Sequence, residues 1–88
     1  KNKCDILLYR LGDFYETFFD DALKLSKETG LHSRPFKNNK EILICGMIFH
    51  KSHHYINILI SKGYKVLIRD FIDGKESIME GTEFIKNT

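Results

Sequence analysis

The sequence predicts one small α/β (α+β) domain, in which a single mixed β-sheet is flanked by helices in the order β-α-β-β-α-β. Three observations support this fold class. Short apolar runs end at glycines, two longer stretches repeat apolar residues at helical spacing, and 88 residues with a 42% hydrophobic fraction suffice for one modest core. We expect the domain to cover residues 1–88, with a core at 5–72 and an edge strand or linker at 73–88. This length excludes a large active-site architecture.

The first predicted element is a strand over Asp5–Arg10, because the apolar run Ile6-Leu7-Leu8-Tyr9 lies between a charge and Gly12. A run this short and this apolar leaves little room for a helical period. The strand is therefore expected to be buried and to end at Gly12.

A helix is predicted over Phe14–Thr29, where apolar residues recur at helical spacing, and Gly30 ends it. In the run Gly12-Asp13-Phe14-Tyr15-Glu16, Asp13 then caps the helix, and Glu16 three residues later completes a capping box. Phe14 falls on the first turn, where its ring projects beyond the end of the element and reaches a partner. The alternative for Phe14 is a core aromatic, and Tyr15 is expected to pack in the core.

The middle of the chain predicts a brief strand over Leu31–Arg34, because Pro35 favours extended backbone at the residue before it. The polar stretch Pro35–Glu41 suits a hairpin connection or a mobile loop. A central strand follows over Ile42–Ile48, and Gly46 within it marks a bulge or a close approach of backbone.

The second half predicts a helix over His53–Lys62, capped by Ser52, and then a strand over Tyr64–Ile72. Asp73-Gly74 turns the chain. The weak periodicity of the remaining residues leaves two alternatives open, an edge strand or the start of a linker.

Composition narrows the function classes. A net charge of +2 is far below that of a purely electrostatic nucleic-acid binder, so shape and stacking must contribute if nucleic acid is the ligand. Cys4 and Cys45 lie far apart without a CxxC spacing, which favours reduced structural thiols. The chain starts at Lys1 and shows neither a leader nor a membrane span, so we expect a piece of a longer intracellular protein with no membrane partner.

Two clusters of polar side chains suggest a metal-binding site. His50, His53 and His54 form an H-x-x-H-H pattern, but no Glu follows the first His as in a zincin, and polar surface at a helix start explains the pattern equally. Asp70, Asp73 and Glu76 with Lys75 suggest a nuclease site, although their spacing across a turn is generic. We therefore expect no metal and no catalytic residue in this domain. The sequence also lacks the Gly-x-x-x-x-Gly-Lys-Ser/Thr pattern of ATP-binding loops.

Several blocks together resemble the N-terminal mismatch-recognition domain (domain I) of the MutS family of DNA mismatch repair proteins. The resemblance runs from Asp5 to about Ile72, and its first block is specific, because the family pattern of Arg, an apolar residue and Gly-Asp-Phe-Tyr-Glu is matched without a gap. The matching blocks are Asp5–Glu16, Phe18–Ala22, Gly46 with His50 and Tyr55, and Lys62–Val66.

The resemblance implies that Phe14 stacks on a mispaired or unpaired base from the minor groove and that Glu16 hydrogen-bonds the same base. Its partner is then double-stranded DNA with a mismatch or a small insertion/deletion loop. His50 is expected at the DNA backbone or sugar, and Arg34 and Lys37 at phosphates unless they only keep the surface soluble. ATP and Mg belong to an ATPase elsewhere in a dimeric parent protein, which is cytoplasmic and nucleoid-associated if bacterial.

The chain departs from the family pattern in four places. Cys4 replaces a usual Pro, Gly46-Met-Ile-Phe-His50 replaces Gly-Val-Pro-Tyr-His, and Arg69-Asp-Phe71 replaces Cys-Glu-Gln. Pro35-Phe-Lys-Asn-Asn39 replaces a Gly-rich loop. These departures indicate a divergent member. Two other functions stay open, namely a divergent domain that binds proteins or DNA junctions without sensing mismatches, and a small metal-dependent hydrolase.

Overall fold

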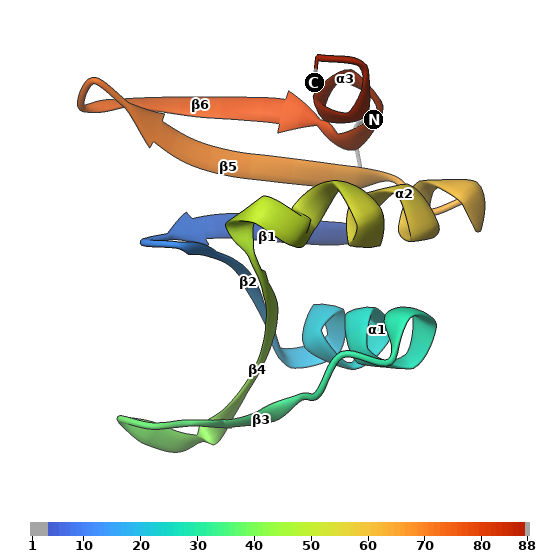
Figure 1. The fold of residues 1–88 in the computed structure, drawn as a ribbon. Helices are drawn as coiled ribbons and strands as arrows, with labels where there is room; N and C mark the ends of the chain where they lie inside the picture. Colours follow the sequence, from blue (N-terminus) through green and yellow to red (C-terminus); the bar gives the residue numbers. More distant parts are fainter. Residues whose placement is uncertain (1–3, 88) are drawn as a thin grey trace.

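The computed structural model describes residues 4–87, which form one six-stranded sheet with three α-helices (Figure 1). The strands are β1 (Ile6–Leu11), β2 (Phe14–Phe18), β3 (Arg34–Phe36), β4 (Asn39–Ile48), β5 (Val66–Ile72) and β6 (Lys75–Glu80). The helices are α1 (Phe19–Thr29), α2 (Ser52–Ser61) and α3 (Gly81–Lys86), and a 3-10 turn, η1, covers Phe49–Lys51. The predicted fold class is confirmed.

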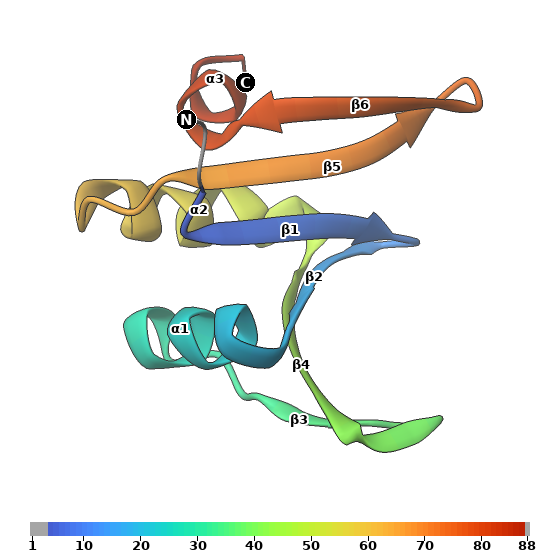
Figure 2. The same cartoon turned by 180° about the vertical axis from the view of Figure 1, so that it is seen from behind.

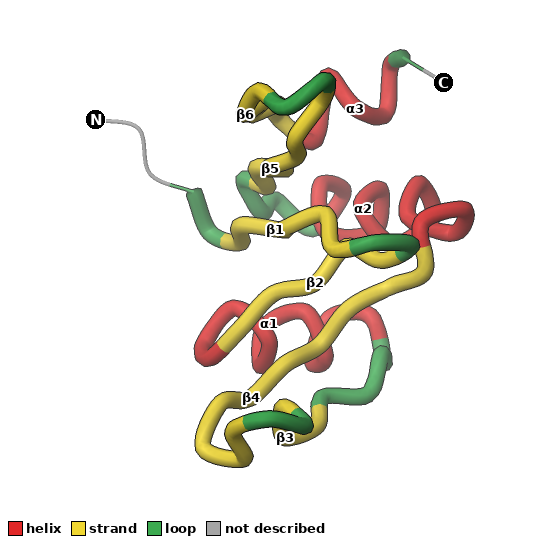
Figure 3. The backbone as a smooth tube through the Cα atoms, turned by 90° about the vertical axis from the view of Figure 1, so that its left-hand side faces the viewer, coloured by secondary structure: helices red, strands yellow, loops and turns green. Residues whose placement is uncertain are grey.

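The strands lie in the order β3-β4-β2-β1-β5-β6. Only β1 and β5 pair in parallel, and the other neighbours are antiparallel, so the sheet is mixed as predicted. The β5–β6 hairpin forms one edge and the β3–β4 hairpin the other, with β2 and β4 running side by side between them (Figures 1 and 3).

The hydrophobic core lies between the sheet and the helices, which gather on one face of it (Figure 2). Each strand turns alternate residues toward that face. The fully buried side chains include Ile6, Leu8, Leu25, Met47, Ile56 and Leu59. The opposite face carries no helix within residues 4–87, and we call it the open face.

The predicted helix over Phe14–Thr29 is wrong in its first third. Residues Phe14–Phe18 form β2, and α1 begins only at Phe19. Asp13 is therefore no helix cap, and no capping box forms with Glu16, because the N-cap position belongs to Phe18 and has no side-chain hydrogen bond. The spacing of Phe14 and Phe18 fits a strand period of two as well as a helical turn. These residues form a strand because their backbone pairs with both β1 and β4.

Three boundaries in the middle of the chain also differ. The short strand is β3 at Arg34–Phe36 rather than Leu31–Arg34, and β4 starts at Asn39, so the expected loop reduces to a tight hairpin turn. Ser52 is the first residue of α2 rather than its cap. Its hydroxyl donates to the Phe49 carbonyl (2.6 Å) and so supports η1.

Of the two alternatives for the C-terminal residues, the edge strand is the one observed, as β6. It is followed by a helix, α3, that was not predicted. The turn at Asp73 and Gly74, both with positive φ, joins β5 to β6 as expected. Helix α3 then folds back against α2, and Phe84 and Ile85 pack on the core. Gly81 starts α3 in close contact with Ile60 and Val66, which leaves little room for a side chain there.

Candidate nucleic-acid interface

The β1–β2 hairpin forms a tight corner that presents Phe14. Gly12 takes a positive φ of 61° in the turn, which glycine adopts without strain. Phe14 is the first residue of β2, lies opposite Leu11 and Ile48 in the sheet, and is 41% exposed. The ring is thus accessible at the start of a strand, although the sequence predicted it on a helical turn.

The corner is braced by β4 and η1. The Phe49 amide donates to the Asp13 carbonyl (2.7 Å), which ties the hairpin turn to the end of β4. Tyr15, the neighbour of Phe14, points to the other side and is 3% exposed, with its ring 5.6 Å from Phe49 and 5.8 Å from Phe84. The prediction that Tyr15 packs in the core is confirmed.

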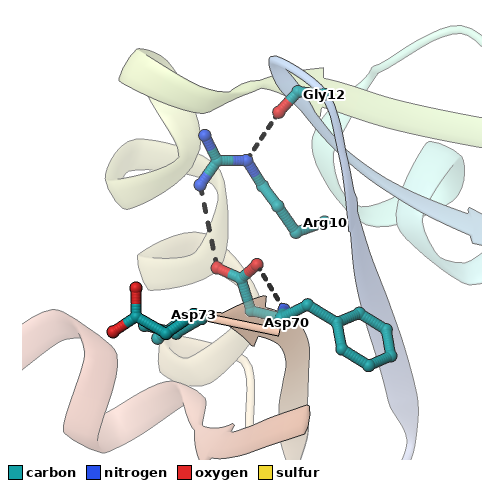
Figure 4. Close-up of a pocket in the computed structure, with 6 residues that line it drawn as sticks. Arg10, Gly12, Asp70 and Asp73 are labelled. Carbon is teal, nitrogen blue, oxygen red and sulfur yellow. Dashed lines mark hydrogen bonds and ion pairs between the residues drawn. The ribbon is translucent and has the colours of Figure 1, made fainter. Parts of the chain in front are cut away.

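Arg10 is a further residue of this corner that sequence reasoning did not single out. Its Nε donates to the Gly12 carbonyl (2.7 Å), and its guanidinium carbon lies 3.8 Å from the centre of the Phe49 ring. One guanidinium nitrogen is 3.8 Å from Asp70 Oδ2, so Arg10 spans from the turn to β5 (Figure 4). The arginine that precedes Leu11-Gly12 was a visible signal, but its partners come from distant segments.

Glu16 lies on the open face, two residues after Phe14 and opposite Tyr9 of β1 and Gly46 of β4. It is only 7% exposed. Its Oε1 is buried without a hydrogen-bond partner, and its Oε2 lies 3.9 Å from Arg34 Nη2. Burial raises the pKa of the Glu16 carboxyl above its usual value of 4.5, while the Arg34 guanidinium opposes part of that rise.

The absence of a side chain at Gly46 makes room for this carboxyl group. A Cβ built at Gly46 would collide with Glu16 Oε1 and would lie 2.5 Å from the Tyr15 carbonyl oxygen. The predicted close approach at Gly46 is confirmed, and the approaching groups belong to β2.

The remaining predicted contact residues lie at different places relative to the Phe14 corner. Arg34 is exposed on the edge strand β3 and reaches Glu16 through its ion pair. His50 is exposed in η1, next to Phe49 and therefore near the corner. Lys37 is exposed in the β3–β4 turn, at the far end of that hairpin from the Phe14 corner. The structure thus brings Arg34 to Glu16 and His50 close to the Phe14 corner, and it leaves Lys37 apart.

Three of the groups considered for a metal, His53, Asp70 and Glu76, have other partners. His53 stacks on Phe84 at 5.0 Å, and its Nε2 lies 3.1 Å from the Ile85 carbonyl. Asp70 accepts from the Phe71 amide (2.7 Å) and pairs with Arg10 (Figure 4). Glu76 pairs with Arg69 at 2.7 Å. Among residues 4–87, no three His, Cys, Asp or Glu side chains gather where a metal ion could bind.

The fold and the corner define a small α+β domain with an exposed aromatic ring on a braced hairpin and a buried carboxyl group beside it. The chain belongs to the MutS domain I family, whose profile matches residues 1–84. A DNA mismatch repair protein MutS of Finegoldia magna is 56% identical over 70 residues, which are 77% of this chain and 8% of that protein.

Other relatives give the same picture. A DNA mismatch repair protein MutS of Caldicellulosiruptor saccharolyticus is 50% identical over 70 residues, 77% of this chain and 8% of that protein. One of Staphylococcus epidermidis is 49% identical over 65 residues, 72% of this chain and 7% of that protein. The chain therefore spans less than a tenth of the length of these relatives. No helix within residues 4–87 has the length and apolar character needed to span a membrane.

Proposed function

We propose that this chain is the mismatch-sensing domain of a DNA mismatch repair protein and that Phe14 wedges between base steps from the minor groove at mispaired or unpaired bases. The observation that carries the proposal is the 41% exposed Phe14 ring at the braced β1–β2 corner. Family membership and relatives named as DNA mismatch repair proteins support the same function.

The wedge explains how a single ring discriminates between duplexes. Separating two stacked base steps costs a few kcal/mol, and the cost is lowest where base pairing is already lost. Insertion of Phe14 is therefore easiest at a mismatch or a one-base bulge. Because every base offers a flat face, stacking tolerates any base at that position.

Glu16 supplies the second part of the proposed mechanism. An ionised carboxylate facing DNA is repelled by the phosphates, and it cannot donate a hydrogen bond. Burial already disfavours the ionised form of Glu16, and its Oε1 has no partner in the structure. Glu16 thus bonds a base edge either by accepting from a base donor or by taking up a proton and donating. In undistorted DNA Glu16 has neither a base donor nor a proton, so its negative charge weakens binding.

Positive and polar groups around the corner complete the proposed interface. Arg34 and Lys37 on the β3–β4 hairpin contact phosphates, and His50 in η1 contacts the backbone or a sugar. Such contacts position the domain without reading sequence. The domain itself needs no cofactor in this proposal.

The parent protein carries the remaining functions. The relatives are more than ten times longer than the aligned region, so ATP and Mg binding and dimerisation belong to segments outside this domain. A bacterial parent acts on DNA in the cytoplasm.

The proposal is tested by comparing Phe14→Ala with its parent in the full-length protein. We expect the variant to lose its preference for a duplex with a mismatch or one-base bulge over matched duplex, with an unchanged thermal unfolding profile. Phe19→Ala is the matched control, because Phe19 is 59% exposed and, as the first residue of α1, follows the end of β2 opposite to Phe14. Equal mismatch preference in Phe14→Ala and parent refutes the wedge. DNA binding without any mismatch preference in the parent supports the alternative of a junction-binding or interaction domain.

A further inference from the structure

We propose that Arg34 is a specificity-determining residue that limits mismatch preference by shielding the charge of Glu16 when matched DNA is bound. This inference rests on the proposed function above. It differs from a role for Arg34 as a phosphate contact alone, because it makes the effect of Arg34 depend on Glu16.

The geometry of the Arg34–Glu16 pair allows the guanidinium to lie near the Glu16 carboxylate and a DNA phosphate at the same time. Arg34 Nη2 lies 3.9 Å from Glu16 Oε2, which is an ion-pair distance and too long for a hydrogen bond. The Glu16 side chain is 10% exposed, whereas the Arg34 side chain is 54% exposed on the edge strand β3. A guanidinium has five donors, so the exposed side of Arg34 is available to a phosphate while the other side faces Glu16.

No other cation within residues 4–87 forms an ion pair with Glu16. The groups that face it are Tyr9 from β1, Gly46 from β4 and Arg34 from β3. Cys45 of β4 is close enough for both charges to influence its thiol. Arg34 is therefore the main source of positive charge at this carboxyl group.

The shield affects matched and mismatched complexes differently. In the matched complex Glu16 remains ionised and faces the polyanion, so the cation of Arg34 offsets the repulsion. In the mismatched complex a base edge or a proton already satisfies Glu16, so less repulsion remains to be offset. Removal of Arg34 consequently weakens matched binding more than mismatched binding.

The experiment is a double-mutant cycle in the full-length protein with Arg34→Gln, Glu16→Gln and the combination. Affinities for one mismatched and one matched duplex are measured at fixed salt. Lys37→Gln is the matched control, because Lys37 lies on the same hairpin and forms no ion pair within the described residues. Thermal unfolding checks the fold of each variant, and Arg34→Lys, which keeps the charge, should behave like the parent.

We expect Lys37→Gln to lower the affinity for the matched and the mismatched duplex by the same factor. Arg34→Gln should raise the ratio of mismatched to matched affinity about two- to fivefold, the range expected of a partly exposed ion pair. In the Glu16→Gln background the same change should leave the ratio unaltered. Because Arg34 favours the ionised carboxylate, mismatch preference should also persist to higher pH in Arg34→Gln than in the parent.

Three results overturn the inference. If Arg34→Gln lowers both affinities equally, then Arg34 is a phosphate contact only. If it changes the ratio equally with and without the Glu16 carboxylate, then Arg34 does not act through Glu16. In either case a parent that still prefers mismatched duplex leaves the proposed function standing. A parent without mismatch preference overturns both proposals together.

Discussion

Gly46 and Glu16 lie opposite each other on β4 and β2, and the carboxyl group of Glu16 occupies the space where any side chain at Gly46 would be. Nothing in the backbone conformation of Gly46 requires glycine, since its φ is not positive. The requirement for glycine therefore comes from the neighbouring strand. The glycine and the buried carboxyl group form one structural unit.

Gly46→Ala should destabilise the chain by about 1–3 kcal/mol, because the added methyl group overpacks this contact. Removing the carboxyl group with Glu16→Ala should relieve only part of the loss, since the Tyr15 carbonyl oxygen also lies 2.5 Å from the new Cβ. Chemical unfolding measures both effects. Gly81→Ala is the comparison, because a Cβ there would lie 3.0 Å from the flexible end of Ile60 and 3.1 Å from Val66 Cβ, which is less severe than the clash at Gly46. Its loss should therefore be smaller, and a loss as large as that of Gly46→Ala would contradict the argument.

Glu16→Gln should become more stable relative to its parent as the pH rises from about 4.5 toward neutral. The pKa of Glu16 is raised in the folded state, so the folded protein holds its proton more tightly than the unfolded chain. Stability from this group is then lost as the pH rises through the folded pKa. The measurement is the difference in unfolding free energy between variant and parent across this range.

Glu28→Gln should show the opposite pH dependence and so serves as the comparison. The Tyr64 hydroxyl (2.7 Å) and the Lys62 ammonium (3.1 Å) donate to Glu28 and lower its pKa below the usual 4.5. The stabilisation is present above the unfolded pKa and is lost as the pH falls through the folded pKa. Parallel difference curves for Glu28→Gln and Glu16→Gln would contradict one of the two assignments, and the shared direction of the curves would show which one.

Phe19→Asn should stabilise the chain by about 1 kcal/mol, because a bulky residue in the left-handed region is strained and Asn is tolerated there. Phe19 has a φ of 53° and is 59% exposed, so little packing is lost. Thermal unfolding tests the change. Leu23→Asn, at a 54% exposed position inside the same helix, should instead lower stability by a few tenths of a kcal/mol.

Arg10→Met should loosen the β1–β2 corner without unfolding the domain. The variant loses the bond to the Gly12 carbonyl, the contact with the Phe49 ring and the pair with Asp70. Together these losses should cost about 1–2 kcal/mol. Hydrogen exchange of the Phe49 amide, which is bonded to Asp13, should accelerate. Arg69→Met is the control, and an equal acceleration there would show that Arg10 does not brace the corner.

The sequence was sufficient for the fold class, for β1, β4 and β5, and for the turn at Asp73-Gly74, because each has a strong local signal. It failed at β2, where Phe14 and Phe18 satisfy both a helical and a strand period. Pairing with residues 44–48 resolves that ambiguity, and such pairing is invisible in a local window.

In the candidate site, too, features with a local sequence signal were predictable and features that depend on distant segments were not. The close approach at Gly46 was predictable, since an isolated glycine in an apolar strand signals it. The proximity of Arg34 to Glu16 was not, because the two strands that carry them are separated by β4. Arg10 was missed for the same reason, since its partners Phe49 and Asp70 come from distant segments.

The bond between the Phe49 amide and the Asp13 carbonyl joins segments that are more than thirty residues apart, so the tip of the hairpin is fastened on two sides. A tip held in this way loses little conformational entropy when it binds a partner, because folding has already ordered it. In the proposed function, the contacts with DNA would then be directed to forcing bases apart instead of to holding a loose loop still.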